Sequence, residues 1–279
     1  MLQISELYIY PIKSLGGIAV NKATITDRGL QHDRRWMLVD EYNLFLSQRV
    51  VPEMALLQVS IESDGLRVVH KLKGDSLLIP FNAVLPEKRE IVTIFDDTCL
   101  AEYVSKEADQ WFTKTLDINC RLVRMPDDSR RPVDQRYAPG DQITSFSDGY
   151  PFLIIGQASL NELNSRLAEP LPINRFRPNI VFTGGEPFEE DTMGHLTINK
   201  IDFYGVKLCG RCPIPTLDQT TAQRGTEPLK TLATYRSKNH NVYFGQNLVH
   251  AGNGTIAVGD TLQVVSKNHD ERFVINPVF

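Results

Sequence analysis

Short apolar segments separated by turn signals fill the first hundred residues, and this pattern limits the possible folds more than any other feature of the chain. Segments that are apolar at every second position, or throughout, are typical of β-strands. We predict such strands at 2–10, 19–26, 36–39, 43–48, 54–60, 66–71, 76–80 and 91–95. Because no helical periodicity separates them, the pattern favours a barrel or sandwich over a parallel α/β sheet.

Helical segments are few and begin later in the chain. The first is predicted at 105–115, with an apolar face that includes Phe112. A strand at 120–123 and a long arginine-rich polar loop at 125–140 follow. Loops of this length in compact domains are usually functional or disordered.

The second half of the chain again combines short strands with short helices. Ser159-Leu160-Asn161-Glu162 has the spacing of a capping box, which predicts a helix at 159–167. A second helix is predicted at 226–236, with Pro228 in its first turn. Further strands are predicted at 152–155, 180–183, 196–201, 206–208, 243–249 and 255–265. The predicted fold class is mostly β with some helix (α+β).

Composition excludes several classes of protein. The chain has 279 residues, of which 42% are hydrophobic and 23% charged, as in ordinary soluble domains. A formal net charge of −4 gives no indication of a nucleic-acid or anionic-membrane partner. No apolar run approaches the length of about 18 residues that spans a bilayer. The N-terminus reads as a strand without the regions of a signal peptide, so we expect a cytoplasmic protein.

The segment 208–216 places Cys209 and Cys212 three residues apart, with Arg211 between them and two prolines beyond. A thiol on a stiff loop beside a permanent cation has good surroundings for a thiolate. Four readings compete for this pair: neutral packing residues, a zinc site, a thioredoxin-type redox pair, or a single thiolate that binds a soft metal or carries sulfur. The zinc and thioredoxin readings are weak, because the remaining ligands and the helical context are missing.

Five further stretches place polar and cationic residues where strand patterns end. They are Lys13-Ser14 before two glycines, Arg34 after Asp33, Arg49 after Gln48, Asp148 ahead of a buried strand, and the run Arg175-Phe176-Arg177-Pro178-Asn179. Taken singly, most would be turn residues or solvated charges. Alternation would send Arg175, Arg177 and Asn179 to one face, where an anion would have to meet them.

Six motifs in register resemble those of one known family. They are Tyr10-Pro11-Ile12-Lys13-Ser14, Ser145 to Leu153, Arg175 to Val181, Cys209-Gly210-Arg211-Cys212, Pro228 to Leu232, and Phe244-Gly245-Gln246-Asn247. Together they resemble MOSC-domain proteins with an N-terminal β-barrel domain, most of all the bacterial YcbX-type group, which is related to the mitochondrial amidoxime reducing component. The resemblance implies an N-terminal MOSC β-barrel domain at 1–121, a C-terminal MOSC β-barrel domain at 122–269 and a tail at 270–279.

The resemblance also implies a molybdenum cofactor, Mo-molybdopterin, and assigns roles to residues. Cys212, the second cysteine of its motif, corresponds to the protein ligand of the molybdenum, whereas Cys209 has no assigned role. Asp148 corresponds to an acid close to the metal, and it either relays protons there or only orders its loop. Lys13 and Ser14 correspond to contacts with the cofactor's phosphate end. The other implied cofactor contacts are Arg34, Arg49, Arg177 and Asn179.

The activity implied by the family is the two-electron reduction of N-hydroxylated compounds such as amidoximes and hydroxylamines. Longer YcbX-type proteins continue into a ferredoxin domain that this sequence lacks. The expected electron donor is therefore a separate ferredoxin, flavodoxin or flavoprotein reductase. The alternative is a sulfur carrier or cofactor-delivery module that uses a persulfide on Cys212. A third possibility is an anion-binding module with structural cysteines.

Overall fold

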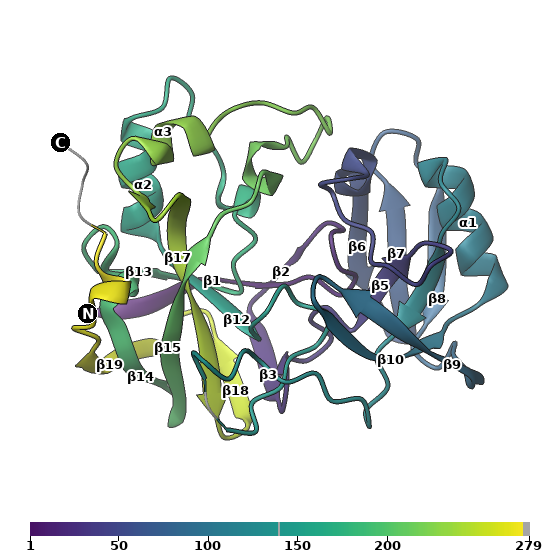
Figure 1. The fold of residues 1–279 in the computed structure, drawn as a ribbon, viewed down its shortest axis with the longest axis horizontal. Coiled ribbons are helices and arrows are strands. Elements are labelled where there is room, and N and C mark those ends of the chain that lie inside the picture. The colour runs from purple at the N-terminus through teal and green to yellow at the C-terminus, as the bar shows by residue number, and fades with distance from the viewer. Residues whose placement is uncertain (139, 276–279) are drawn as a thin grey trace.

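Strand β1 (Leu2–Ile9) lies in a sheet built mainly from the second half of the chain (Figure 1). The computed structural model describes residues 1–138 and 140–275. The strand order of this sheet is β12 (Phe152–Gly156), β13 (Ile180–Thr183), β1, β19 (Thr261–Lys267), β14 (Met193–Ile198), β15 (Ile201–Gly210) and β17 (Asn241–Ala251). Because β12 also pairs with β17, these strands close into a barrel.

Short strands attach to this barrel, and together they form the barrel lobe. β2 (Ile18–Val20) pairs with β1, and β16 (Ser237–Lys238) pairs with β17. A three-stranded sheet has the order β18 (Gly254–Ala257), β3 (Lys22–Thr26) and β4 (Gly29–Leu30). Segments from both the beginning and the end of the chain therefore contribute strands to the barrel lobe.

The small lobe contains residues 36–124 and lies beside the barrel lobe (Figure 1). One of its sheets has the order β5 (Trp36–Val39), β11 (Arg121–Arg124), β10 (Asp97–Tyr103) and β9 (Leu85–Ile94). The other is the meander β6 (Leu57–Ile61), β7 (Gly65–His70) and β8 (Ser76–Pro80). The mostly β fold that we predicted is confirmed.

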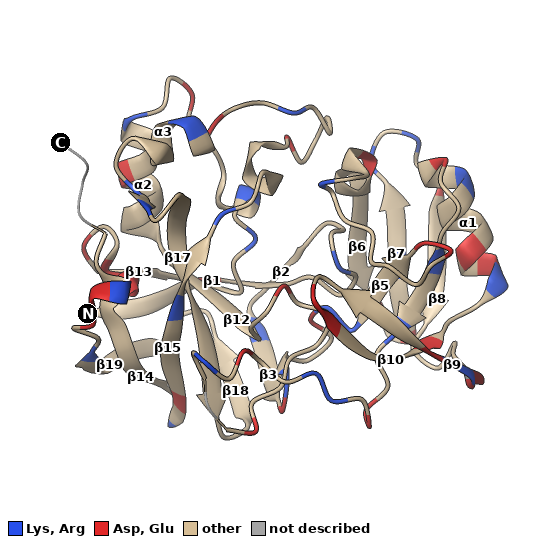
Figure 2. Cartoon of the chain, in the orientation of Figure 1, with Lys and Arg blue, Asp and Glu red and all other residues tan. Residues whose placement is uncertain are grey.

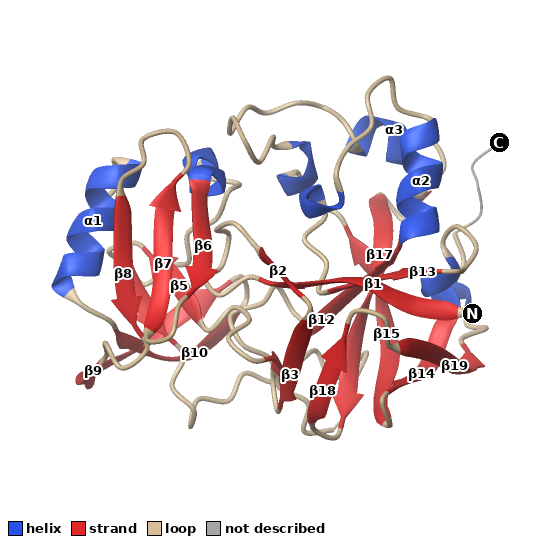
Figure 3. Ribbon diagram, turned by 180° about the vertical axis from the view of Figure 1, so that it is seen from behind, coloured by secondary structure: helices blue, strands red, loops and turns tan. Residues whose placement is uncertain are grey.

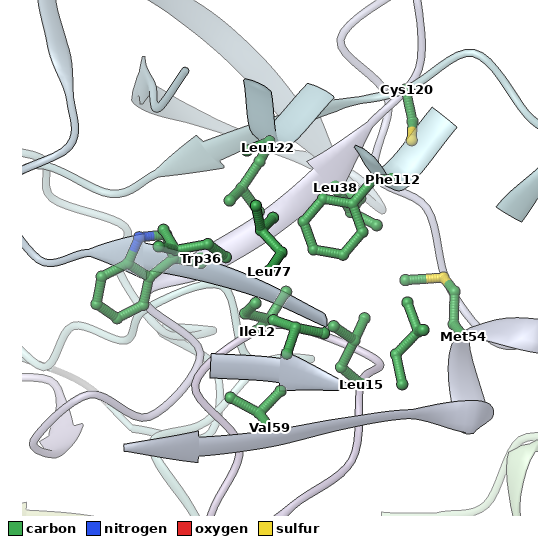
Figure 4. Close-up of a cluster of buried hydrophobic side chains, with 14 of the residues drawn as sticks. Ile12, Leu15, Trp36, Leu38, Met54, Val59, Leu77, Phe112, Cys120 and Leu122 are labelled. Carbon is green, nitrogen blue, oxygen red and sulfur yellow. The ribbon is translucent and has the colours of Figure 1, made fainter. Parts of the chain in front are cut away.

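Helix α1 (Lys106–Leu116) covers the small lobe and confirms the helix predicted at 105–115. Ser105 caps it, since its hydroxyl accepts a hydrogen bond of 3.1 Å from the amide of Ala108. Phe112 is fully buried and packs in a cluster with residues of both sheets (Figure 4). This cluster also contains Ile12 and Leu15, so the segment after β1 is anchored in the small lobe.

Helices α2 (Gln157–Ser165) and α3 (Leu229–Ala233) lie at one end of the barrel (Figure 3). The predicted capping box was wrong, because α2 begins before Ser159. The Ser159 hydroxyl instead donates a hydrogen bond of 2.8 Å to Glu190 and accepts one of 2.7 Å from the Phe188 amide. The Ser159 hydroxyl, which the local pattern predicts as a helix cap, therefore bonds to buried groups of a distant segment.

Other local predictions were wrong where pairing at long range decides the conformation. Segment 43–48 forms only isolated bridges, and 54–60 begins as the 3₁₀ helix η1 (Pro52–Leu56). Strand β10 was not predicted. The remaining 3₁₀ turns are η2 (Ile173–Arg175), η3 (Glu189–Thr192), η4 (Ile214–Thr216) and η5 (Glu271–Phe273). The domain bounds 1–121, 122–269 and 270–279 stay predictions, and residues 276–279 lie outside the described part.

Two adjacent carboxylates, Glu190 and Asp191, are buried in the barrel lobe beside one guanidinium, that of Arg236. Asp191 and Arg236 form an ion pair of 2.5 Å in which both side chains are 6% exposed. Glu190 has no cation of its own, and one of its oxygens has no hydrogen-bond partner among the described residues. Burial, together with the neighbouring Asp191 charge, raises the pKa of Glu190 to about 7.

We predict that Glu190→Gln stabilises the protein at pH 8, while Asp191→Asn destabilises it. In the unfolded chain Glu190 ionises near pH 4.3, so between that pH and about 7 the folded state binds more protons. The free energy of unfolding therefore falls as the pH rises through this window. Burial also raises the pKa of Asp191 to about 6, which adds to the decline, so Glu190→Gln should reduce the decline without abolishing it. Asp191→Asn should cost about 3–5 kcal/mol, because it leaves Arg236 buried and unpaired. Urea unfolding at pH 5 and pH 8 measures both; a steeper pH dependence in Glu190→Gln would contradict the prediction.

Candidate functional site

A cleft between the two lobes collects most of the predicted site residues. It encloses about 730 Å³ of space, part of it open to solvent. Its lining includes Lys13, Ser14, Arg34, Asp148, Arg177, Asn179, Cys209, Arg211 and Cys212. Figure 2 shows basic residues on several loops that lie between the lobes. A second, wider hollow shares Asp148 and Cys209 with this cleft.

Lys13 is buried at one wall of the cleft, with 3% of its surface exposed. Its ammonium donates hydrogen bonds of 2.8 Å to the Phe146 carbonyl and 2.6 Å to the Asp148 carboxylate. It also lies 5.4 Å and 5.3 Å from the ring centres of Phe45 and Phe95. Burial lowers the pKa of Lys13 to about 8, although the Asp148 charge opposes this shift. The ammonium is therefore charged at neutral pH.

Asp148 reaches into the cleft from the loop before β12. Its side chain is 68% exposed and lines both the cleft and the wider hollow beside it. Desolvation by the surrounding protein raises the pKa of Asp148, and the charges of Lys13, Arg49 and Arg34 outweigh that effect. They hold its pKa well below the usual range. Asp148 is thus an ionised carboxylate throughout the neutral range.

Two guanidiniums stack on one tyrosine at the end of β1. Arg34 and Arg177 each lie 4.3 Å from the ring centre of Tyr10, which is itself 1% exposed. Arg34 donates to Asp33 at 2.6 Å and to the side chain of Asn179 at 3.1 Å. Both Arg34 and Arg177 have a positive φ, 49° and 56°, a conformation that costs free energy for residues other than glycine.

Arg177 has no hydrogen bond from its guanidinium to any described residue, and it forms no ion pair there. Burial lowers the pKa of Arg177 to about 10, with the neighbouring Arg34 charge adding to the effect. A cation that is desolvated without a carboxylate partner is costly unless a ligand supplies the negative charge. The geometry around Arg177 therefore fits an anionic ligand in the cleft.

The alternation predicted for the run 175–179 was wrong for Arg175. This residue belongs to the 3₁₀ turn η2, and its side chain turns away to the Pro215 carbonyl and to Asp218, at 2.9 Å and 3.0 Å. Of the three residues predicted to share a face, Arg177 and Asn179 line the cleft. Asn179 is 1% exposed and accepts hydrogen bonds from Arg34 and from the Leu153 amide.

The two cysteines of the 209–212 segment have different surroundings. Cys209, near the end of β15, accepts a hydrogen bond of 3.0 Å from Arg211, which also donates to the Phe176 carbonyl at 2.6 Å. The cation that the sequence places between the two cysteines therefore contacts Cys209. Burial raises the pKa of Cys209, and Arg211 opposes the shift. Cys212 lines the cleft half-buried, without a described cation in contact.

Cys99 and Cys120 are buried in the small lobe, away from the cleft. Burial raises the pKa of each thiol to about 11. Within residues 1–138 and 140–275, no group of three or more His, Cys, Asp or Glu side chains is placed to hold a metal ion. A metal at Cys212 would therefore need further ligands from a cofactor.

The described helices also include none long and apolar enough to cross a membrane.

Arg49 lies near the cleft but does not line it. Its guanidinium is 4.7 Å from the ring centre of Phe95, and its charge contributes to the low pKa of Asp148.

Sequence reasoning missed Asp33, which is 2% exposed and accepts hydrogen bonds from both Arg34 and the Tyr10 amide. It also missed Phe95, whose contacts depend on the folding of β9 and β10. The Asp33-Arg34 adjacency was the one local signal available.

Comparisons with known proteins show which family the chain belongs to. Two family models match it, the MOSC N-terminal beta barrel domain over residues 1–119 and the MOSC domain over residues 141–263. Mitochondrial amidoxime reducing component 2 of Bos taurus is 33% identical over 242 residues, which cover 84% of this chain and 72% of that protein. The chain belongs to the MOSC-domain family. The matched MOSC domain contributes Asp148, Asn179 and Cys212 to the cleft, and the matched N-terminal domain contributes Lys13 and Arg34.

Other relatives of this MOSC protein carry two different names. Mitochondrial amidoxime-reducing component 1 of Homo sapiens is 32% identical over 95% of this chain and 83% of its own length. Molybdenum cofactor sulfurase of Oryza sativa subsp. japonica is 29% identical over 94% of this chain but only 35% of its own length. Among solved structures, the YUAD protein of Bacillus subtilis superposes over 94% of each chain with a TM-score of 0.43 and 11% identity.

We predict that Asp148→Asn lowers the pKa of Lys13 below its value of about 8. The carboxylate attracts the proton of the ammonium, and its removal leaves burial and the Arg131 and Arg34 charges to act alone. The Lys13 resonance in ¹⁵N-detected NMR titrations measures this pKa. Glu162→Gln, which alters an ion pair on α2, is the control and should leave the titration unchanged. An unchanged or raised Lys13 pKa in Asp148→Asn would contradict the ion pair.

Proposed function

We propose that the chain is a molybdenum-cofactor-dependent reductase of N-hydroxylated compounds, with Cys212 as the protein ligand of the metal. One observation carries the proposal: a single cleft contains a half-buried thiol and several cations, one of which lacks a partner. A molybdopterin has a phosphate at one end and a soft metal at the other, and it requires these two kinds of residue in one cavity.

The cationic wall fits the phosphate end of such a cofactor. Lys13, Arg34 and Arg177 line the cleft, while Asp148 and the buried Asp33 are the carboxylates beside them. Ser14 adds a hydroxyl and has a left-handed backbone, with φ of 67°. Guanidiniums suit phosphate because they donate in a planar fork, and Arg177 has its donors free among the described residues.

The thiol wall fits the metal end. Cys212 is the candidate ligand because it lines the cleft without a cation in contact, whereas the Cys209 sulfur is already engaged by Arg211. Thiolate sulfur is a soft ligand that suits such a metal. When bound, the cofactor supplies a metal that changes its oxidation state by two electrons and removes oxygen from the substrate. The residues of the chain bind the cofactor, orient it and set the charge around it.

The proposed substrate class is supported by the names of several relatives, the mitochondrial amidoxime reducing components. Reduction of an N-hydroxylated compound to the amine or amidine consumes two electrons and two protons and releases water. We propose a separate electron donor, a ferredoxin, flavodoxin or flavoprotein reductase. The wider hollow that opens beside Asp148 and Cys209 provides access for a small substrate.

Asp148 serves as a counter-ion in this proposal. A general acid needs a pKa near the working pH, and the cations around Asp148 hold its pKa far lower. This argues against a role as proton donor and favours its function as the partner that keeps Lys13 charged and in place. A proton relay through Asp148 would require its pKa to rise when the cofactor binds.

A second candidate function is a sulfur carrier or cofactor-delivery module with a persulfide on Cys212. The likeness to molybdenum cofactor sulfurase over nearly the whole of this chain favours it. This chain spans only about a third of the length of that relative, so the sulfurase's other segments have no counterpart in the match. A persulfide would be detected as labile sulfane sulfur on protein that contains no molybdenum.

The test is the molybdenum content of protein purified from a host that makes the cofactor. We expect about one molybdenum per chain in the wild type and loss of most of it in Cys212→Ala, because the metal loses its only protein ligand. Cys209→Ala is the matched control and should keep the metal. The wild type should also reduce an aromatic amidoxime with reduced methyl viologen as the electron donor.

Three outcomes would contradict the proposal in different ways. Metal retained in Cys212→Ala and lost in Cys209→Ala would show that Cys209, and not Cys212, is the protein ligand. Stoichiometric metal without amidoxime reduction would leave the cofactor but reject the substrate class. Absence of molybdenum from the wild type, with sulfane sulfur that disappears in Cys212→Ala, would support the sulfur carrier instead.

A further inference from the structure

The arginine-rich loop at 125–140 contains one arginine that is almost completely buried. Arg131 is 1% exposed and belongs to the largest fully buried side chains of the described residues. It lies on the segment that connects the small lobe to the barrel lobe. A buried charge of this size requires a complete set of partners, and the identity of those partners indicates what the residue does.

All five N–H donors of the Arg131 guanidinium have acceptors. Two of them donate to the Asp97 carboxylate, at 3.0 Å and 2.7 Å. Two others donate to the carbonyls of Ser145 and Ser147, at 2.9 Å and 2.6 Å. The last donates to the carbonyl of Asp148 at 3.3 Å. No donor remains for a ligand, so Arg131 is not itself a ligand-binding cation.

The carbonyls of the segment 145–148 are divided between two cations. Arg131 donates hydrogen bonds to the carbonyls of Ser145, Ser147 and Asp148. Lys13 donates one of 2.8 Å to the carbonyl of Phe146. The segment is therefore clamped between a guanidinium on one side and the cleft ammonium on the other. This arrangement fixes the direction in which the segment delivers its last side chain.

That last side chain is the carboxylate of Asp148. Among the described residues, Lys13 is its only hydrogen-bond partner, at 2.6 Å, and Gly149 follows it without a side chain to pack. The placement of the carboxylate thus depends on the backbone before it. Arg131 also links this backbone to β10 of the small lobe through Asp97, so it couples the position of Asp148 to the lobe that faces the cleft.

We propose that Arg131 is a positioning residue for the Asp148–Lys13 pair, and through that pair for the group bound in the cleft. The kinetic part of this proposal rests on the proposed reductase function, whereas the structural part does not. The competing role is purely structural: a buried ion pair with Asp97 that ties the loop to β10 and has no influence on Asp148.

The first test measures the titration of the Asp148 carboxyl in cofactor-free protein by ¹³C NMR. The charged and titratable groups that face this carboxyl are Lys13, Arg34, Arg49, Arg177 and the thiol of Cys209. Arg131→Lys keeps the charge but cannot reach three carbonyls and Asp97 together. We expect the pKa of Asp148 to rise by at least about one unit towards its ordinary value near 4, because the carboxylate leaves Lys13. An unchanged Asp148 titration in a folded Arg131→Lys protein overturns the proposal.

The control for this test lies in the same loop. Arg136 is an exposed arginine, 83% accessible, that pairs only with Asp134. Arg136→Lys should leave the Asp148 titration unchanged. Arg131→Gln is the stronger variant of the test residue, and if it fails to fold, Arg131→Lys still decides the outcome.

The second test is a double-mutant cycle on the molybdenum-loaded enzyme, with turnover normalised to bound metal. We expect Arg131→Lys to reduce kcat about tenfold or more with little change in KM, since a small misplacement at a site has effects of this order. If Arg131 acts through Asp148, adding Arg131→Lys to Asp148→Asn causes no further loss. Losses that multiply would show that Arg131 acts independently of Asp148. If the wild type contained no molybdenum or showed no turnover, the proposed function would be rejected. The NMR titration would still test whether Arg131 positions the Asp148 carboxylate.

Discussion

The pairing of β1 with β13 is the interaction on which the cleft depends. β1 closes a barrel whose other strands come from the second half of the chain, and Leu7 lies opposite Ile180 in the ladder. The end of β1 therefore meets the start of β13, where Arg177 and Asn179 are located. The segment with Lys13 then crosses into the small lobe, anchored by Ile12 in its core. This strand therefore brings Lys13 and Arg34 beside the lobe that carries Arg177 and Cys212.

Positive charge concentrated by this pairing explains the electrostatics of the site. The Tyr10 ring supports two guanidiniums, and Lys13 lies beside them with the Asp148 carboxylate as its counter-ion. The surplus of cations lowers the pKa of Asp148 and adds to the lowering of the Lys13 pKa, which is caused mainly by burial. An anion in the cleft would relieve both effects. The low pKa of the Asp148 carboxylate is thus a consequence of the cations that surround it.

Sequence reasoning succeeded where local chemistry decides and failed where distant segments meet. The helix at 105–115 was predictable because its cap and apolar face are local. Lys13, Ser14, Arg34, Asp148, Arg177, Asn179 and Cys212 line one cleft, whereas Arg49 stacks on Phe95 outside that lining, and the roles proposed for these residues stay predictions. The membership of β1 in the barrel, the contact of Arg211 with Cys209 and the burial of Arg131 were not predictable, because each depends on segments that fold together from far apart in the chain.

The central claim is that the cleft holds a molybdenum cofactor whose metal is bound by Cys212. X-ray absorption at the molybdenum edge of the purified, metal-loaded protein tests it most directly, because it counts sulfur ligands. We predict one sulfur more on the metal in the wild type and in Cys209→Ser than on the residual molybdenum that Cys212→Ser retains. The same number of sulfur ligands in wild type and Cys212→Ser, or a loss only in Cys209→Ser, would contradict it.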